Sequence, residues 1–406
     1  MPLLPDDAVV PVLMFHSVGL RDHAWSWRHL SEPLDNFVAF LDWLTAHGFH
    51  TIDLAELQAH MTGEERAPAN SVVLTFDDGY LDNWVYAAPL LRQRGMRGTV
   101  FVTPDFVDPG EAIRPSMEDV WAGRTSTSAL AAAGFMNWEE LRQLDRAGVL
   151  DVQSHAITHT WWFTGPDIIG WHRGERLSPW PWLAWNARPD RKPWYLVEDQ
   201  SAFVPAGQPV FANRQALVAR RFDPDPDAVE ALTNHVAARG GREFFNGGHW
   251  RKELERIASG IAPGGPFPGR YESEAERQVR VRDEISGSRH RIAQAMEKPV
   301  DYICWPAGGS DDFCEQEAAR AGYSGWTLRS SQQRSKRNRP GEDPRSFRRL
   351  SGQRGIFLGR KSRGEGSLRF QALQLQAHRN SALHGALLRG YKLAAAMGLA
   401  GKRTGP

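Results

Sequence analysis

The chain has few cysteines and no long apolar run, and each of these two absences excludes a class of protein. It also has almost no net charge. Its 406 residues include only Cys304 and Cys314, which are too few for a disulfide framework and lack the spacing of a cysteine metal site. No stretch approaches the ~20 apolar residues that a membrane span requires. The net charge of +1 identifies no class of partner, and no internal repeat is evident. Residues 1–7 lack the basic and apolar regions of a signal peptide, so we expect a cytoplasmic protein.

An apolar, β-branched run ends in two adjacent carboxylates. Residues 71–76 read Ser-Val-Val-Leu-Thr-Phe, and Asp77, Asp78 and Gly79 follow. This pattern predicts a buried strand that delivers both carboxylates to the mouth of a parallel sheet or barrel, with Gly79 allowing the backbone to turn. Neighbouring strand residues point to opposite faces, so adjacent carboxylates indicate two different roles. A plain strand-end turn, in which Asp and Gly are common, is the competing interpretation.

A second apolar stretch ends in two histidines four residues apart. Residues 149–154 read as a strand and lead into His155 and His159. On a helical turn this spacing puts both imidazoles on one face, where they suit two ligands of one metal. The pair alone is a weak signal, but a carboxylate-bearing strand end earlier in the chain makes it much stronger.

The two motifs together resemble a known family. Thr75-Phe76-Asp77-Asp78-Gly79 and Ser154-His155-Ala156-Ile157-Thr158-His159 are similar to the first two motifs of the polysaccharide deacetylases (the NodB-homology domain, carbohydrate esterase family 4). The resemblance implies that Asp78, His155 and His159 hold a divalent metal, usually zinc, and that Asp77 is the catalytic base. Three protein ligands leave a position open for water, as in catalytic zinc sites. Such a metal lowers the pKa of water and polarises an acetyl carbonyl, and a nearby carboxylate that takes the proton completes an amide hydrolase.

The third family motif is partial. Residues 300–309 resemble it: Pro306 is kept, its arginine is missing, and Ala307 stands at its tyrosine position. The resemblance implies that the backbone N–H of Ala307 binds the oxyanion, a catalytic role that survives a change of side chain. Another arginine is then needed to orient Asp77, and the sequence does not identify it.

The general acid of the family is also missing, because no Leu-x-His motif is found. The proton donor is therefore sought among three histidines, water or Asp77 itself; the histidines are His16, His172 and His249. We assign His16 to the catalytic site because it follows the apolar run at residues 9–14, the predicted first barrel strand. The competing interpretation is a hydrogen-bonded histidine at a strand end.

The predicted fold is of the α/β class: a deformed (β/α) barrel of the polysaccharide deacetylase type with a large Trp-rich insertion. We expect the barrel in residues 1–160 and 271–330, an insertion or lid subdomain at 161–270, and a basic loop with a C-terminal helical segment at 331–406. Helical patterns cover residues 34–48, 84–95, 137–148, 213–220, 225–238, 272–296 and 313–322. His378 is expected at the surface of the C-terminal helix.

The insertion is expected either to pack on itself or to wall the substrate groove. Seven of the 16 tryptophans lie between residues 161 and 194, and indole rings serve both a core and stacking against sugar rings. In the second interpretation the sugar contacts are Trp161, Trp162 and, outside the insertion, Trp305.

Two further stretches bear on partners. Residues 329–363 are rich in Lys and Arg, which fits a solvated loop or an anion site for a phosphorylated or lipid-linked sugar. No nucleic-acid motif accompanies them, so no nucleic acid is expected. Residues 368–401 are Leu- and Ala-rich and suit packing on the barrel or lying on a membrane surface. Association with the cell envelope stays open, because many members of the family are exported.

The function expected from these features is metal-dependent N-deacetylation, with zinc as the expected metal. The substrate would be an N-acetylated sugar of a polysaccharide or glycolipid, hydrolysed to acetate and a free amine. Two alternatives remain: a non-catalytic carbohydrate-binding protein on the same fold, favoured by the missing motifs, and an O-acetyl esterase or other amidase that uses the same metal site.

Overall fold

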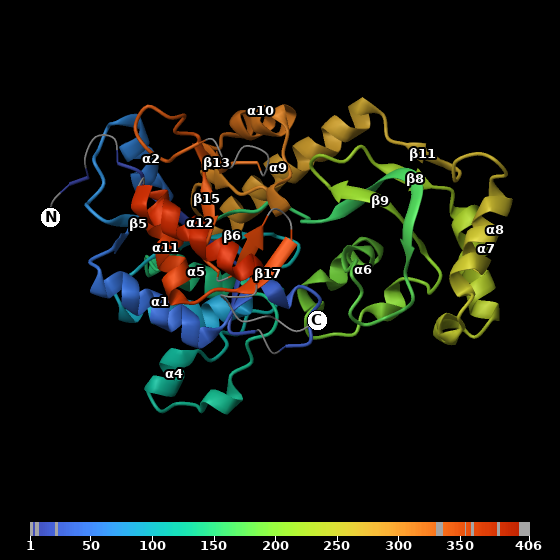
Figure 1. Cartoon of the computed structure of the whole chain (residues 1–406), viewed down its shortest axis with the longest axis horizontal. Coiled ribbons are helices and arrows are strands. Elements are labelled where there is room, and N and C mark those ends of the chain that lie inside the picture. The colour runs from blue at the N-terminus through green and yellow to red at the C-terminus, as the bar shows by residue number, and fades with distance from the viewer. Residues whose placement is uncertain are drawn as a thin grey trace.

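Parallel strands form a nearly closed barrel, which confirms the predicted α/β class and deformed (β/α) barrel (Figure 1). The computed structural model describes residues 3–4, 8–20, 23–329, 336–353, 355–358, 361–379 and 382–397. Around the barrel the strands follow the order β14 (Ser346–Phe347), β13 (Gly325–Thr327), β12 (Tyr302–Ile303), β7 (Leu150–Ser154), β6 (Gly98–Val102), β5 (Ser71–Asp78), β1 (Val12–Phe15) and β15 (Arg349–Ser351). The end strands β14 and β15 are separated by a single residue, Arg348, so the two edges of the sheet meet. A short strand, β4 (His50–Thr51), pairs with the start of β5.

The register of the central strands brings their carboxyl ends to one level. Asp78 lies opposite Val102, Val102 opposite Ser154, and Ser154 opposite Ile303. On the other side of β5, Phe15 pairs with Phe76. All of these pairings are parallel, so the residues that follow each strand gather at one mouth of the barrel, where such folds carry their active sites.

Helices cover the outside of the barrel. Their bounds are α1 (Leu34–Ala46), α2 (Leu54–Thr62), α3 (Ala88–Gln93) with a preceding π-helical turn at Asn83–Ala87, α5 (Trp138–Arg146), α9 (Glu274–Met296) and α10 (Asp312–Ala321). In α1 the buried positions Phe37, Phe40, Leu41 and Leu44 form one apolar stripe that packs on the strands. Helix α5 begins with the predicted capping box, in which Asn137 and Glu140 each bond the other's backbone.

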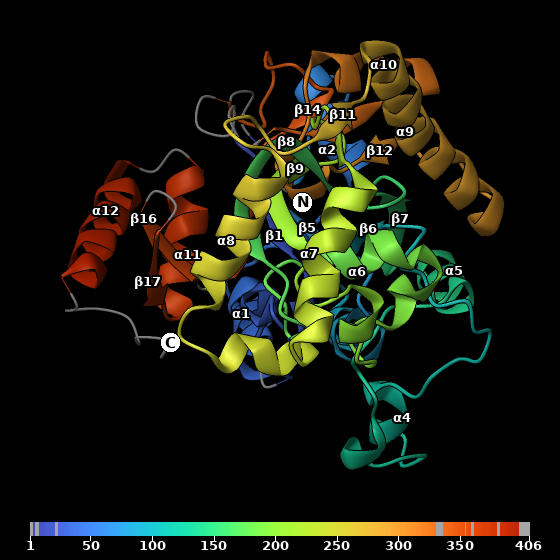
Figure 2. The same cartoon turned by 90° about the vertical axis from the view of Figure 1, so that its right-hand side faces the viewer.

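The connection between β6 and α5 extends away from the barrel. It carries two short helices, α4 (Met117–Trp121) and a 3-10 turn at Thr127–Ala129, and α4 projects from the rest of the molecule (Figure 2). The capping box at Ser116 and Asp119 stabilises the first turn of α4.

Residues 161–271 form two antiparallel strand pairs and three helices, seen at the right of Figure 1. The strands are β8 (Trp161–Trp171) with β9 (Pro209–Gln215), and β10 (Phe222–Pro224) with β11 (Gly269–Tyr271); the helices are α6 (Trp182–Ala187), α7 (Pro226–Ala238) and α8 (Trp250–Ile261). The helix predicted at 225–238 is confirmed, whereas the helix predicted at 213–220 is wrong. Pairing with β8 holds residues 209–215 in a strand, so tertiary context overrides local propensity there.

This segment packs partly on itself and partly on the barrel mouth. One apolar cluster lies wholly within it, around Phe211, Leu232 and Leu254. A second cluster joins its Trp182 and Trp185 to barrel-side residues that include Tyr80, Phe106 and Phe135. One part of the segment therefore packs on itself and another part packs on the barrel.

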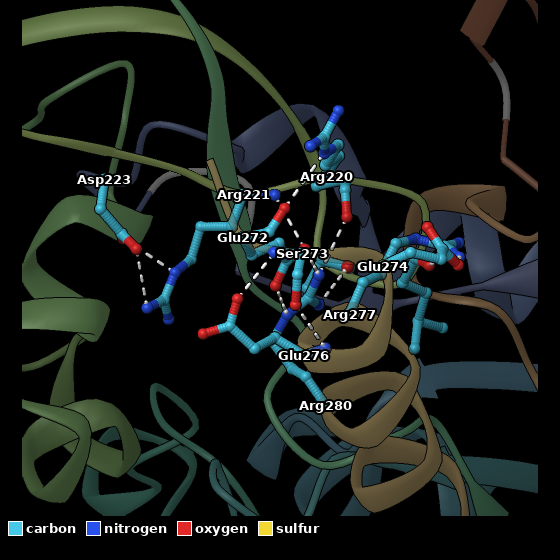
Figure 3. Close-up of polar contacts among 12 residues, drawn as sticks. Arg220, Arg221, Asp223, Glu272, Ser273, Glu274, Glu276, Arg277 and Arg280 are labelled. Carbon is cyan, nitrogen blue, oxygen red and sulfur yellow. Dashed lines mark hydrogen bonds and ion pairs between the residues drawn. The ribbon is translucent and has the colours of Figure 1, made fainter. Parts of the chain in front are cut away.

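Helix α9 ties this segment to the barrel through a polar network around the buried Glu272 (Figure 3). The Glu272 carboxylate accepts hydrogen bonds from the backbone N–H of Arg221, at 2.8 Å, and from the Arg280 guanidinium. Arg280 also donates to the carbonyl oxygens of Ala216 and Ala219. These contacts fix the first turns of α9 against the chain that leaves β9.

The C-terminal segment packs against the barrel. It contains the strand pair β16 (Gly355–Leu358) and β17 (Lys361–Glu365), then α11 (Leu368–His378) and α12 (Ala382–Ala396), drawn in red in Figures 1 and 2. A smaller parallel pair joins β2 (Ser17–Val18) to β3 (Ser31–Glu32). Gln371 of α11 donates to the Gly352 carbonyl at 2.7 Å and to Glu32. The expectation that His378 is a surface residue is wrong, because it is 4% exposed at the end of α11.

The basic stretch at 329–363 lies only partly within the described residues, since residues 330–335, 354 and 359–360 lie outside them. Several of its described cations already have carboxylate partners. Arg329 pairs with Glu315 at 2.6 Å and Lys336 with Asp343 at 3.4 Å. Among the described helices, none has the length and apolar character needed to cross a membrane.

Candidate active site

Asp78, His155 and His159 converge at the mouth of the barrel. The Asp78 Oδ1 atom lies 3.3 Å from His155 Nε2 and 3.4 Å from His159 Nε2. All three side chains are buried, and Asp78 Oδ1 has no hydrogen-bond partner. A cation bound between this carboxylate oxygen and the two imidazole nitrogens would give the buried oxygen a partner. The three ligand atoms all lie within 4.8 Å of one another, so the group fits a metal ion.

The tautomer of His155 also fits metal binding. Its Nδ1 lies 2.8 Å from the carbonyl oxygen of Cys304, which can only accept a hydrogen bond. Nδ1 therefore carries a proton, which leaves Nε2, the nitrogen that faces Asp78, as the atom that can ligate a metal. This outer hydrogen bond is the usual way in which proteins orient a metal-binding histidine.

The histidines do not lie on a helical turn, contrary to the sequence prediction. The chain from His155 to His159 is irregular, and Ala156 and His159 have positive φ angles of 58° and 44°. Asp78 also has a positive φ, of 74°. Such backbone is disfavoured for residues with a Cβ atom and clusters at functional sites. The two imidazoles converge through this local distortion rather than through helical spacing.

Asp77 turns to a different set of partners. The Arg349 guanidinium donates two parallel hydrogen bonds to it, from Nη1 to Oδ1 at 2.6 Å and from Nη2 to Oδ2 at 2.8 Å. Both residues are buried. Arg349 starts β15 opposite Val12, so its side chain rises inside the barrel towards the carboxylate and also donates to Thr75. No local pattern marks Arg349, which lies 272 positions beyond Asp77 in the chain.

The electrostatics of the two carboxylates have different causes. Burial raises the pKa of Asp77, but the Arg349 guanidinium, with His155 and His16, outweighs it and holds this pKa below its ordinary value. Burial likewise raises the pKa of Asp78, and the imidazoles of His159 and His155 reverse the effect, holding it well below its usual range. Both carboxyl groups are therefore ionised at neutral pH.

Two further side chains approach Asp77. His16 Nε2 lies 3.8 Å from Asp77 Oδ2, and the Nδ1 atom of His16 is buried without a hydrogen-bond partner. The Cys304 thiol lies 3.6 Å from the same carboxylate oxygen and 2.9 Å from Arg349 Nη2. Cys304 and Cys314 are both free and buried, as expected of reduced cysteines. The sequence had shown no role for Cys304 at the site.

The remaining histidine candidates lie elsewhere. His172 is buried at the end of the β8 hairpin, where its ring faces the Ser201 carbonyl. His249 is exposed and precedes the first turn of α8. Of the three candidate proton donors, His16 is the one whose ring lies beside Asp77.

The two adjacent tryptophans of β8 face opposite ways. The Trp161 ring lies 5.4 Å from the His159 ring and contacts Trp27, so it borders the site. Trp162 instead stacks under the Arg221 guanidinium, 5.0 Å away, in a groove beside α9. Alternation along a strand explains the difference. Strand β8 therefore presents one of these indoles to the site.

Trp305 is 1% exposed and packs in the barrel core, so the expectation that it contacts a sugar is corrected. Its position after a central strand turns the indole inward, where it fills core volume. Ala307 lies two residues further on, exposed and with a φ of 49°, in the turn that follows β12. Its carbonyl accepts a hydrogen bond from Gln215 of β9.

Comparisons with known proteins agree with these motifs. The sequence profile of the polysaccharide deacetylase family matches residues 64–179, a stretch that contains both carboxylates and both histidines. The predicted resemblance to the polysaccharide deacetylases is confirmed. YxkH of Bacillus subtilis (strain 168), a protein named for this family, is 35% identical over 95 residues, which cover 23% of this chain and 32% of YxkH.

A second relative is the poly-β-1,6-N-acetyl-D-glucosamine N-deacetylase of Escherichia coli (strain K12). It is 24% identical over 143 residues, covering 35% of this chain and 20% of the enzyme. The matched stretches thus span a third or less of these relatives.

Among solved structures, the BpsB deacetylase domain of Bordetella bronchiseptica superposes with a TM-score of 0.49 and 18% identity, over 86% of this chain and 97% of that domain. IcaB of Ammonifex degensii gives a TM-score of 0.45 and 16% identity, over 86% of this chain and 94% of its own. At this distance the neighbours say nothing about the chemistry of the site, which rests on its own geometry.

Proposed function

We propose that this protein is a metal-dependent N-deacetylase that hydrolyses the acetamide of an N-acetylated sugar to acetate and a free amine. One observation carries the proposal: a buried, unpartnered Asp78 oxygen faces two histidine nitrogens, and a second carboxylate beside it is held by a buried arginine. Asp78, His155 and His159 would hold the metal, with zinc as the expected ion because two imidazoles and a carboxylate suit it. When bound, the metal would lower the pKa of water and polarise the acetyl carbonyl.

Asp77 is assigned the role of general base. Its bidentate contact with Arg349 fixes the carboxylate plane and keeps it ionised, so that it can accept a proton from the attacking water. Arg349 thereby takes the orienting role for which the third motif lacks an arginine. The non-catalytic alternative was favoured by two missing features, the arginine of the third motif and the Leu-x-His motif. With Arg349 in the orienting role, the first of these no longer favours it.

His16 is assigned the role of proton donor to the leaving amine. Its ring lies beside Asp77 and is partly open to the mouth, with a side-chain exposure of 13%. The backbone N–H of Ala307, in the exposed turn after β12, is assigned to the oxyanion. Both roles are proposals that rest on position at the barrel mouth.

The substrate class is inferred from the surroundings of the site and from the relatives. Trp161 offers an aromatic face beside His159, as sugar-binding sites do. The Escherichia coli relative is named for deacetylation of a poly-N-acetylglucosamine. An N-acetylated glycan is therefore the first substrate to test. A lipid-linked sugar, which also carries an anionic group, is the second.

The test is metal content together with acetate release, measured on the purified protein and on His155→Ala with N-acetylglucosamine oligomers. We expect the wild-type protein to bind about one zinc ion and release acetate, and the variant to lose both, because a catalytic zinc site needs all three ligands. An O-acetylated sugar serves as the competing substrate. Faster release from it would identify an esterase, and metal binding without acetate release from either substrate would favour a carbohydrate-binding protein.

A further inference from the structure

The loop between the two histidines is held by a residue distant in sequence, Glu284 of helix α9. Its Oε2 atom accepts hydrogen bonds from the backbone N–H groups of Ile157, at 3.1 Å, and Thr158, at 3.0 Å. Its Oε1 atom accepts one from the Thr158 hydroxyl. A single carboxylate thus satisfies three donors in a loop that has no regular secondary structure.

The other side of the same loop is held by a buried cation. Lys192, which is 2% exposed, donates from Nζ to the Thr158 carbonyl oxygen at 2.9 Å and to Asp105 at 3.2 Å. Arg291 of α9 contacts Asp105 as well, at 2.9 Å. The loop is therefore clamped between α9 and the segment that follows β8, and α9 runs from that segment to the barrel in Figure 1.

The clamp matters because the loop conformation is unfavourable by itself. Ala156 and His159 flank the clamped residues, and both have positive φ angles. Without Glu284 these part-buried backbone N–H groups would lose their acceptor, and turning the loop outward to water would separate the imidazoles. The contacts of Glu284 therefore favour the one backbone path that brings His155 and His159 to Asp78.

We propose that Glu284 is a positioning residue that sets the metal affinity of this protein without touching the metal. The inference rests on the proposed metal site and concerns the preorganisation of that site. Partners that orient the ligands of a metal typically contribute 10–100-fold to its affinity. Glu284 acts on the backbone of the ligand loop rather than on an imidazole.

The experiment compares zinc affinity in Glu284→Leu, Glu284→Gln and Ile285→Ala, measured by competition with a chromogenic chelator. Leucine removes every acceptor, so zinc binding should weaken by about 10–100-fold. Glutamine keeps one oxygen for the two N–H groups and can donate to the Thr158 hydroxyl, so its affinity should stay within about threefold of the wild type. Ile285 is buried on the same helix, and Ile285→Ala should lower thermal stability while leaving zinc affinity unchanged.

Wild-type zinc affinity in folded Glu284→Leu, or an equal loss in Ile285→Ala, would overturn the inference. If Glu284→Leu does not fold, Thr158→Val removes the hydroxyl contact alone and should weaken zinc binding severalfold; an unchanged affinity there also contradicts it. Because the readout is zinc affinity, wild-type protein that binds zinc but releases no acetate would defeat the proposed deacetylation while leaving this inference standing. Wild-type protein that binds no zinc would defeat both.

Discussion

Asp77 and Asp78 are neighbours in the chain, yet they belong to two different sides of the site. Asp78 faces two imidazoles from one short loop, 77 and 81 residues further along the chain, within the stretch that matches the family profile. Asp77 faces His16, which directly follows β1, and Arg349, which starts β15; both lie outside that stretch. The proposed metal ligands thus come from two motifs within one matched stretch, whereas the residues around Asp77 are far apart in the chain but lie on or directly after the neighbouring strands β5, β1 and β15.

The comparison shows how a residue outside the family motifs can supply a contact that the motifs lack. A metal ligand must present a particular atom at a set geometry, which ties its residue to one strand end. A guanidinium that orients a carboxylate can reach it from any strand that lines the same lumen, because the side chain is long and its donors form a planar fork. Arg349 reaches Asp77 from β15, in place of an arginine in the turn after β12.

Replacing each aspartate by asparagine is the strongest test of the different roles proposed for Asp77 and Asp78. Asp77→Asn should keep the metal and lower acetate release by roughly 10²–10⁴-fold, the usual contribution of a general base. Asp78→Asn should lose the metal and acetate release together. Metal content and acetate release, measured on both variants, check the prediction. Wild-type activity in Asp77→Asn, or loss of its metal, would show that the assigned roles are wrong.

Removing Arg349 tests its pairing with Asp77 through the free energy of unfolding of the protein. Arg349→Met leaves the buried Asp77 carboxylate unpaired, so the free energy of unfolding should fall by about 3–5 kcal/mol. The double variant Asp77→Asn/Arg349→Met should recover part of this loss, since no buried charge remains. Urea unfolding is measured on the wild type, both single variants and the double variant. Arg345→Met, at an exposed position, is the control and should be near neutral; additive effects in the double variant would argue against the pair.

The proton donor should show a smaller effect on rate. His16→Gln should lower acetate release from N-acetyl substrates by about 10²-fold, at the low end for an acid catalyst because water can also deliver the proton. Release from an O-acetyl substrate should fall less, because an alkoxide leaves more readily than an amide nitrogen that has not been protonated. Metal content should not change. Equal losses on the two substrates would assign His16 a structural role instead.

A further expected effect lies outside the proposed site, in the pH dependence of stability. Burial, with a contribution from Arg337, lowers the pKa of His378 to about 4. The folded state therefore disfavours the charged imidazole, and its contribution is fully present above about pH 6.5 and lost as the pH falls through about 4. The difference amounts to at most about 3 kcal/mol.

The variant His378→Leu should remove this part of the pH dependence. Its free energy of unfolding should decline less than that of the wild type between pH 6.5 and 4. His290→Leu, at an exposed position on α9, should leave the profile unchanged. Parallel profiles for His378→Leu and the wild type would show that His378 is not held neutral in the folded protein.

Local signals carried much of the prediction and failed where tertiary contacts outweighed them. Helix α1 and the capping box of α5 follow from apolar spacing and from residues three positions apart. The helix predicted at 213–220 is absent, because β8 recruits residues 209–215 as its partner strand. Trp305 and His378 were misplaced for a related reason: burial depends on what packs against a residue, which a local pattern does not show.

The sequence by itself determined the strand that ends in Asp77 and Asp78, the histidine pair, the barrel class and the family resemblance, because each of these is written in residues close together in the chain. Only the tertiary structure decided which arginine meets Asp77, which candidate histidine stands beside it, and which carboxylate clamps the ligand loop. The contacts of Arg349 and Glu284 span 272 and 126 positions. Such contacts arise from the closure of the barrel and the packing of α9, and no spacing rule along the chain encodes them.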